Sequence, residues 1–340
     1  MKTLIQNLAL LVGSLVVALG AAEALSRVVL PVQATPFVDA YGHQVDLHVD
    51  GNRLRPNVQV WQHTTEFNAE YTTTAAGHRV PGTAGSPDMV FIGDSFTFGY
   101  GVSDTDTFVF LFCREHTLSC ANLGRAGTGT GQQVDLLTSY LERDGWRPRR
   151  VRLMMFAMTG ALMYGNDLTD NLMYAKKIVN LDTDSLTERS AENALSRYVT
   201  RFRIQLYEYN LARIVLLYAG PLLRSWFTPG ADAALVAQAL KATGEQLARL
   251  DALAHTYGFA YDVMIIHPMQ DILRGTDAQT TRAIGAIAPA GIAVRSTADA
   301  LRPNPARRYY SLDMHLNPAG HRAIADFLAT VERGGEGHHA

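Results

Sequence analysis

The sequence predicts an α/β protein: a three-layer sandwich with helices on both faces of a mostly parallel central sheet of about five strands. From residue 87 onward, short apolar runs alternate with segments of helical spacing, which is the pattern of parallel strands joined by helices. In addition, 47% of the residues are hydrophobic and only 18% are charged, so the chain can bury a large core.

The expected elements follow one another within a domain that we place at residues 87–333. Buried strands are expected at Met89–Ile92, Ser119–Leu123, Val151–Met158, Ala260–His267 and Gly291–Ser296. Helices are expected at Thr107–Glu115, Gly131–Arg143, Ala233–Tyr257 and Asn317–Glu332. Between about residues 159 and 228 the next strand of the alternating pattern is missing. We interpret this stretch as a helical insertion of the kind that often shapes a substrate pocket. A tail of Gly and His occupies residues 334–340.

Residues 31–86 are expected to form a linker and a small β lead-in. Pro31 to Pro36 reads as the linker. Polar and apolar residues then alternate between Tyr41 and Pro81, for example at Val58–Trp61, which is typical of short strands.

Residues 1–30 are expected to be a transmembrane anchor or a signal segment. Thr3 through Ala22 carries no charge, and about 20 such residues in a helix can cross a bilayer. The small residues near Ala22 would also suit a cleaved signal peptide. Since Lys2 places positive charge on the cytoplasmic side, we expect the body of the protein to be periplasmic or extracellular.

Charge and cysteine content narrow the possible partners. The formal net charge is −2 and no extended basic stripe is present, so a nucleic-acid partner is not expected. Cys113 and Cys120, the only two cysteines, could pair in an oxidising compartment or remain as two buried thiols. Two thiols without a His cluster do not complete a zinc site, and we expect neither a metal nor a cofactor.

The sharpest local pattern is Ile92–Gly99, where an apolar strand ends in Gly93-Asp94-Ser95. Ser95 would lie at the carboxyl edge of the sheet, where ligands of open α/β sheets bind. The backbone amides just after Ser95, at the beginning of a helix, could stabilise negative charge that develops on a bound substrate. The alternative is an ordinary turn in which Ser95 caps a helix.

A serine nucleophile needs a base and a group that orients the base. Both are present in Ser311–His321, which covers the loop before the last helix and the beginning of that helix. His315 is the candidate base and Asp313 the candidate orienting carboxylate, whereas His321 falls inside the helix and is interpreted as structural.

Two further loops could stabilise an oxyanion. Asn122–Gly129 follows the second strand, and its glycines allow backbone amides to approach a substrate. Gly165-Asn166-Asp167 follows the third strand and offers an amide side chain.

Taken in order, Gly93-Asp94-Ser95, the turn at Gly127, Gly165-Asn166-Asp167 and Asp313-Met314-His315 resemble the motifs of the SGNH (GDSL-like) hydrolase family. The resemblance covers roughly Pro87 to Leu328 and is strongest to a bacterial, often membrane-anchored branch. It implies a flavodoxin-like fold, Ser95 as nucleophile, His315 as base and Asp313 as its partner. It also implies an oxyanion hole made by the amides of Ser95 and Gly127 and the side chain of Asn166. The chain departs from many members in having only Met314 between Asp313 and His315.

We therefore expect an ester hydrolase or O-acyltransferase that works outside the cytoplasm through a Ser95 acyl-enzyme, on acyl or acetyl esters of cell-envelope glycans. One alternative is a non-catalytic glycan-binding or assembly protein that keeps the fold. Another is a metal-dependent phosphoesterase that would use Asp94, Asp167, Asp313 and His315 as ligands.

Overall fold

The computed structural model describes residues 2–29, 36–47, 53–82, 85–159, 167–182 and 232–336. The chain divides into two units, one of Met1–Ala34 with Thr183–Pro229 and one of Thr35–Asp182 with Gly230–Ala340. The predicted site residue Asn166 and most of the predicted insertion at 159–228 lie outside the described residues.

The second unit is built on a parallel sheet of five strands in the order β4-β3-β5-β6-β7. The strands are β3 (Met89–Gly93), β4 (Cys120–Gly124), β5 (Arg150–Phe156), β6 (Ala260–Ile266) and β7 (Val294–Ser296). This sheet confirms the predicted fold class. The last strand is shorter than Gly291–Ser296, because Gly291 takes a φ of 85° and belongs to the turn before the strand.

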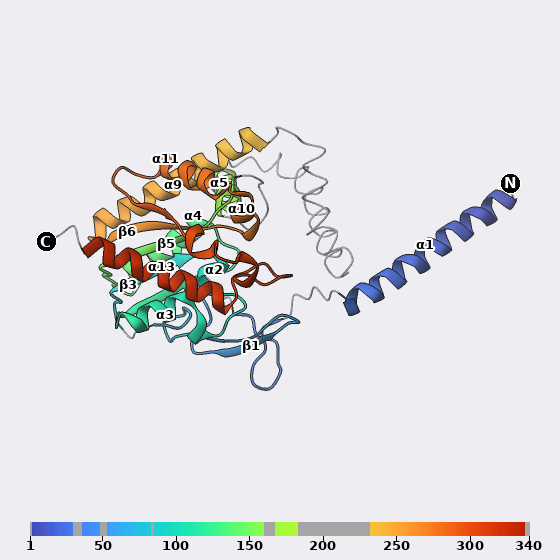
Figure 1. The fold of residues 1–340 in the computed structure, drawn as a ribbon, viewed down its shortest axis with the longest axis horizontal. Helices are drawn as coiled ribbons and strands as arrows, with labels where there is room; N and C mark the ends of the chain where they lie inside the picture. The colour runs from blue at the N-terminus through green and yellow to red at the C-terminus, as the bar shows by residue number, and fades with distance from the viewer. Residues whose placement is uncertain are drawn as a thin grey trace. The chain divides into compact units, whose positions relative to one another are not determined.

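Helices cover both faces of the sheet (Figure 1). One face packs on α4 (Thr130–Arg143), α5 (Asp167–Asp182), α9 (Asp232–Tyr257) and α11 (Asp277–Ile287). The other face packs on α3 (Phe108–Glu115), α12 (Ala298–Leu301) and α13 (Pro318–Glu336). The short helices α2 (Ser95–Phe98) and α10 (Met269–Arg274) and the 3-10 turns at Asp104–Asp106 and Pro305–Arg307 complete the described elements.

Alternation along the strands produces the two faces. In β3, Val90 and Ile92 enter one apolar cluster while Met89 and Phe91 enter the other. Successive side chains of a strand point to opposite faces, so a strand covered on both sides must be apolar throughout. This explains why β3 is an unbroken apolar run up to Gly93.

The lead-in forms an antiparallel hairpin of β1 (Gln59–His63) and β2 (Asn68–Thr72). Its small core includes Tyr71, which stacks on Phe98 of the α2 turn at 5.4 Å between ring centroids. Beside it lies Arg79, which is fully buried and pairs with Asp104. It also donates hydrogen bonds to the carbonyls of Phe98 and Gly99, at the end of α2. The lead-in is therefore bound to the segment that directly follows Ser95.

The N-terminal segment is a helix, α1 (Lys2–Val29). Within the described parts of the chain, no helix combines the length and the apolar character that a bilayer crossing requires. The transmembrane anchor predicted for residues 1–30 is thus not supported.

Cys113 of α3 and Cys120 of β4 form a disulfide, so of the two possibilities that the sequence left open the structure has the paired one.

Candidate active site

Ser95 lies where β3 ends and α2 begins. The Asp94 side chain accepts a hydrogen bond from the Phe96 amide at 2.9 Å and so caps this short helix. Gly93 is required just before it, because a Cβ there would meet the Met154 carbonyl oxygen at 2.5 Å. The abrupt turn sets the Ser95 hydroxyl at the carboxyl edge of the sheet, as predicted from the sequence.

The last loop brings an imidazole and a carboxylate to the same hydroxyl. His315 Nε2 lies 2.8 Å from Ser95 Oγ, and His315 Nδ1 lies 2.5 Å from Asp313 Oδ1. Met314 takes a left-handed φ of 68°, which folds the chain back sharply enough for the two side chains to meet despite the single residue between them. The structure thus brings all three predicted residues into one hydrogen-bonded series.

Two aromatic rings pack on the imidazole, and no specific sequence signal indicated either role. The ring of His315 lies 4.8 Å from that of Phe96 and 4.9 Å from that of Tyr100, between centroids. Tyr100 is itself fixed by a 2.7 Å hydrogen bond from Gln62 of the lead-in hairpin. These contacts restrict rotation of the imidazole about its side-chain bonds.

Gly127 lies in the turn between β4 and α4, at the same edge of the sheet. It is exposed and has a φ of 70°, a backbone conformation that suits glycine. Neither its amide nor that of Ser95 donates to any group in the part of the chain that the structure describes. The oxyanion-hole roles of these two amides, and the position of Asn166, stay predictions.

Three carboxyl groups beside the site have raised pKa values. Burial raises the pKa of Asp94 to about 7, although His315 nearby acts in the opposite direction. Burial also raises the pKa of Asp170 to about 6, and burial together with Asp94 and Asp170 raises the pKa of Asp167. Desolvation disfavours a charged carboxylate, and each neighbouring carboxylate adds to that cost.

Asp167 does not take the place of a metal ligand. Its two oxygens accept hydrogen bonds from the Gln133 side chain and the Phe156 amide, both at 2.8 Å. Across the described ranges, no three His, Cys, Asp or Glu side chains are arranged to hold a metal ion. Both oxygens of Asp167 are thus engaged in hydrogen bonds within the protein.

His321 has the structural role expected from its place inside the helix. Its Nδ1 accepts a hydrogen bond from the Phe108 amide at 3.1 Å, and burial lowers its pKa to about 3. The neutral imidazole of His321 therefore connects α13 to the start of α3 and is not suited to proton transfer.

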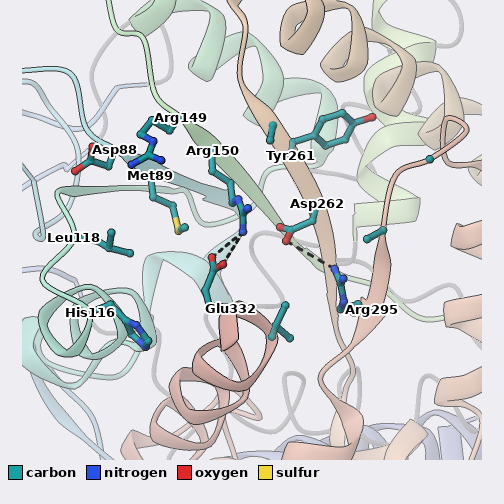
Figure 2. A pocket seen from close by; sticks show the side chains of 14 residues that line it. Asp88, Met89, His116, Leu118, Arg149, Arg150, Tyr261, Asp262, Arg295 and Glu332 are labelled. Atoms are coloured by element: carbon teal, nitrogen blue, oxygen red, sulfur yellow. Dashed lines mark hydrogen bonds and ion pairs between the residues drawn. The ribbon is translucent and has the colours of Figure 1, made fainter. Parts of the chain in front are cut away.

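A hollow of about 870 Å³ lies at the opposite, amino edge of the sheet (Figure 2). It contains none of the predicted site residues. Glu332 accepts hydrogen bonds from Arg150 at 2.8 and 2.9 Å, and Asp262 accepts two from Arg152 at 2.8 Å. The charges that line or underlie this hollow are thus largely paired with one another.

Comparisons with known proteins give similarity of fold only. No protein-family model matches the chain, and no curated protein matches it. A lipolytic protein of the G-D-S-L family from Desulfitobacterium hafniense DCB-2 is 12% identical, with 72% of this chain and 98% of that chain covered and a TM-score of 0.38. A family 2 carbohydrate esterase from Corynascus thermopiles (Myceliophthora fergusii), which carries a carbohydrate-binding domain, is 16% identical, with 77% and 70% covered and a TM-score of 0.35. A catalytic mutant of an acetylxylan esterase from Geobacillus stearothermophilus is 17% identical, with 71% and 92% covered and a TM-score of 0.33. Likenesses this distant do not bear on the activity, which is inferred below from the site itself.

Proposed function

We propose that the protein is a serine-dependent ester hydrolase or O-acyltransferase of the SGNH type, with Ser95, His315 and Asp313 as its catalytic triad. The observation that carries the proposal is the series of two short hydrogen bonds from Ser95 Oγ to His315 and on to Asp313. Two loops far apart in the sequence meet here: one supplies the nucleophile, and the other supplies the base and its orienting group. This is the arrangement that nucleophilic catalysis requires.

In the proposed reaction Ser95 Oγ attacks the ester carbonyl carbon while His315 Nε2 takes the hydroxyl proton. The negative charge moves to the carbonyl oxygen, where the amides of Ser95 and Gly127 and the side chain of Asn166 would donate hydrogen bonds. The tetrahedral intermediate then expels the alcohol, which receives the proton from His315, and an acyl-Ser95 ester remains.

A second oxygen nucleophile completes the cycle. Water attacks the acyl-enzyme in hydrolysis, and a sugar hydroxyl attacks it in acyl transfer; in both cases His315 accepts the proton and returns it to Ser95. Asp313 holds the imidazole so that Nε2 faces the serine and stabilises the imidazolium that forms. The two reactions differ only in the acceptor.

For the substrate we propose acyl or acetyl esters of cell-envelope glycans, with the protein working outside the cytoplasm. The Cys113–Cys120 disulfide supports the location, because such bonds persist in oxidising compartments and are rare in the cytosol. Envelope glycans are esterified polymers that such a location would make accessible, as it would lipids and exogenous esters.

The alternative of a non-catalytic glycan-binding protein depended on the short spacing between Asp313 and His315. That spacing no longer favours it, since the two side chains are in hydrogen-bond contact.

Hydrolysis of a short-chain aryl ester by the full chain tests the proposal, with Ser95→Ala and His315→Ala as the paired variants. Either change should lower kcat on the order of a thousandfold or more while the fold, measured by circular dichroism, is kept. Equal rates in all three proteins would refute an enzyme that uses this triad. Adding a polysaccharide acceptor then separates transfer from hydrolysis by the fate of the acyl group.

A further inference from the structure

The loop that carries Asp313 and His315 is a small hairpin closed at its base. Tyr309 and Leu316 form an antiparallel bridge, and the Tyr310 amide donates to the His315 carbonyl at 2.8 Å. These contacts fix the two ends of the loop. The tip of the loop is formed by residues 311–313, whose amides all donate to one side chain.

A single carboxylate from the lead-in hairpin accepts all three of those amides. Glu66 Oε1 accepts from Ser311 at 2.7 Å and from Leu312 at 2.9 Å. Glu66 Oε2 accepts from Leu312 at 3.0 Å and from Asp313 at 2.7 Å. Hydrogen bonds to an ionised acceptor are about twice as strong as neutral ones, and here one group makes several of them along successive residues.

Glu66 is itself held rigidly, in the turn between β1 and β2. The hydroxyl of Thr64 accepts hydrogen bonds from the Glu66 amide at 3.1 Å and the Phe67 amide at 3.0 Å. The half-buried carboxylate therefore approaches the catalytic loop from a preformed turn that lies 245 residues earlier in the chain.

The residue next to Glu66 reinforces the same contact. The ring of Phe67 lies 5.1 Å from that of Tyr310, at the base of the loop, and 5.7 Å from that of Tyr100. Tyr100 in turn packs on His315. Two adjacent residues of one turn thus reach the base and the tip of the loop that bears the triad.

We infer that Glu66 is a positioning residue of the active site, which fixes the Asp313 backbone so that Asp313 can hold His315 against Ser95. The inference rests on the proposed function, because it assigns Glu66 its role through the triad. Without this acceptor the tip loses four hydrogen bonds between its amides and the lead-in hairpin. A displacement of about 1 Å at a catalytic group can cost about 100-fold in rate, so the expected loss is of that order.

The test compares Glu66→Ala and Glu66→Gln with Glu70→Gln in the full chain. Glu70 is a matched control because it lies on the same hairpin, four residues further on, and its carboxylate binds Gln59 and not the catalytic loop. Two readouts are taken: amide hydrogen exchange over residues 311–315, and the rate at which a fluorophosphonate labels Ser95.

We expect Glu66→Ala to speed exchange at residues 311–313 and to slow labelling about 100-fold, with an unchanged exchange pattern in the central sheet. Glu66→Gln keeps one acceptor oxygen and should lie between Ala and wild type, which keeps the test decisive if the Ala variant folds poorly. In ester hydrolysis the loss should fall on kcat, with KM changed less than about threefold. Glu70→Gln should behave as wild type in every readout.

Unchanged exchange at residues 311–313 in both Glu66 variants would overturn the inference whatever the activity. Faster exchange with an unchanged labelling rate would overturn the positioning role alone, with the proposed function intact. Failure of the wild-type protein to be labelled at all would instead defeat the proposed function, and the catalytic role of Glu66 with it.

Discussion

The two edges of the central sheet bury their charges in opposite ways. At the amino edge, Arg152 is fully buried, pairs with Asp262 and donates a further hydrogen bond to Glu332. At the carboxyl edge, Asp94 and Asp167 are equally buried, yet within the described ranges neither forms an ion pair with Lys or Arg. Their pKa values are raised as a result.

This difference in charge pairing indicates that the amino edge contributes to stability and that the carboxyl edge is the candidate functional edge. Paired charges at the amino edge hold β5 and β6 to α13, through Arg152, Asp262 and Glu332. Uncompensated acids beneath Ser95 cost stability, and structures retain such strain mainly at functional sites. Substitutions at the amino edge should therefore lower stability, and substitutions at the carboxyl edge should change activity or the dependence of stability on pH.

The largest expected effect is on activity at the carboxyl edge. His315→Ala should lower kcat for an aryl ester on the order of a thousandfold or more, because the Ser95 hydroxyl loses its base. His116→Ala, in the hollow at the amino edge, is the control and should leave kcat unchanged. Equal losses of kcat in the two variants would contradict the assignment of activity to the carboxyl edge alone.

The next effect is on stability at the amino edge. Arg152→Met removes the partner of buried Asp262 and should lower the free energy of unfolding by about 3–5 kcal/mol in urea titrations. Arg149→Met, at an exposed position of the same hollow, should change it by less than about 0.5 kcal/mol. A neutral outcome for Arg152→Met would mean that these ion pairs do not hold this edge together.

A smaller, pH-dependent effect is expected at Asp94. Its folded pKa of about 7 exceeds its ordinary value of 3.8, so the folded protein binds more protons between these values and Asp94 makes stability fall as pH rises from about 4 to 7. Asp94→Asn keeps the oxygen that caps Phe96 and removes this cost. The variant should gain up to about 4 kcal/mol over wild type at pH 8 and little at pH 4.

Thermal melts across that pH range measure the difference, with exposed Asp299→Asn as the control. Asp167, Asp170 and His315 also act on Asp94 and will spread the transition over a wider pH range. A gain that does not depend on pH would mean that Asp94 is not the group responsible.

The smallest expected effect is that of the disulfide. It closes a loop with a sequence separation of seven, so Cys113→Ala with Cys120→Ala should cost about 2 kcal/mol of unfolding free energy. Because α3 and the start of β4 lie away from Ser95, kcat should not change. A loss of kcat in protein that is still folded would show that the amino edge also shapes the site.

Much of the fold was predictable because it depends on local patterns. The unbroken apolar run of β3 and the helical spacing of α4, α9 and α13 are determined by burial on fixed faces. Ser95 and His315 were predictable for a related reason, since strand ends and the loops before helices place chemistry at one edge of a parallel sheet.

Other features depend on contacts that leave no local trace. Glu66 stands in a turn of ordinary composition, and its role arises only when residues 311–313 fold against it. Whether Cys113 and Cys120 pair was open because it depends on the direction of two side chains. The anchor or signal segment expected at residues 1–30 was favoured by the absence of charge from Thr3 to Ala22, and no helix within the described residues could span a bilayer.

Labelling of the full chain with a fluorophosphonate, followed by peptide mapping, tests the central claim most directly. An activated hydroxyl predicts modification at Ser95, and the rate in His315→Ala should be lower on the order of a thousandfold. A chain that carries no label at Ser95, or that is labelled equally fast without the imidazole, would contradict the account.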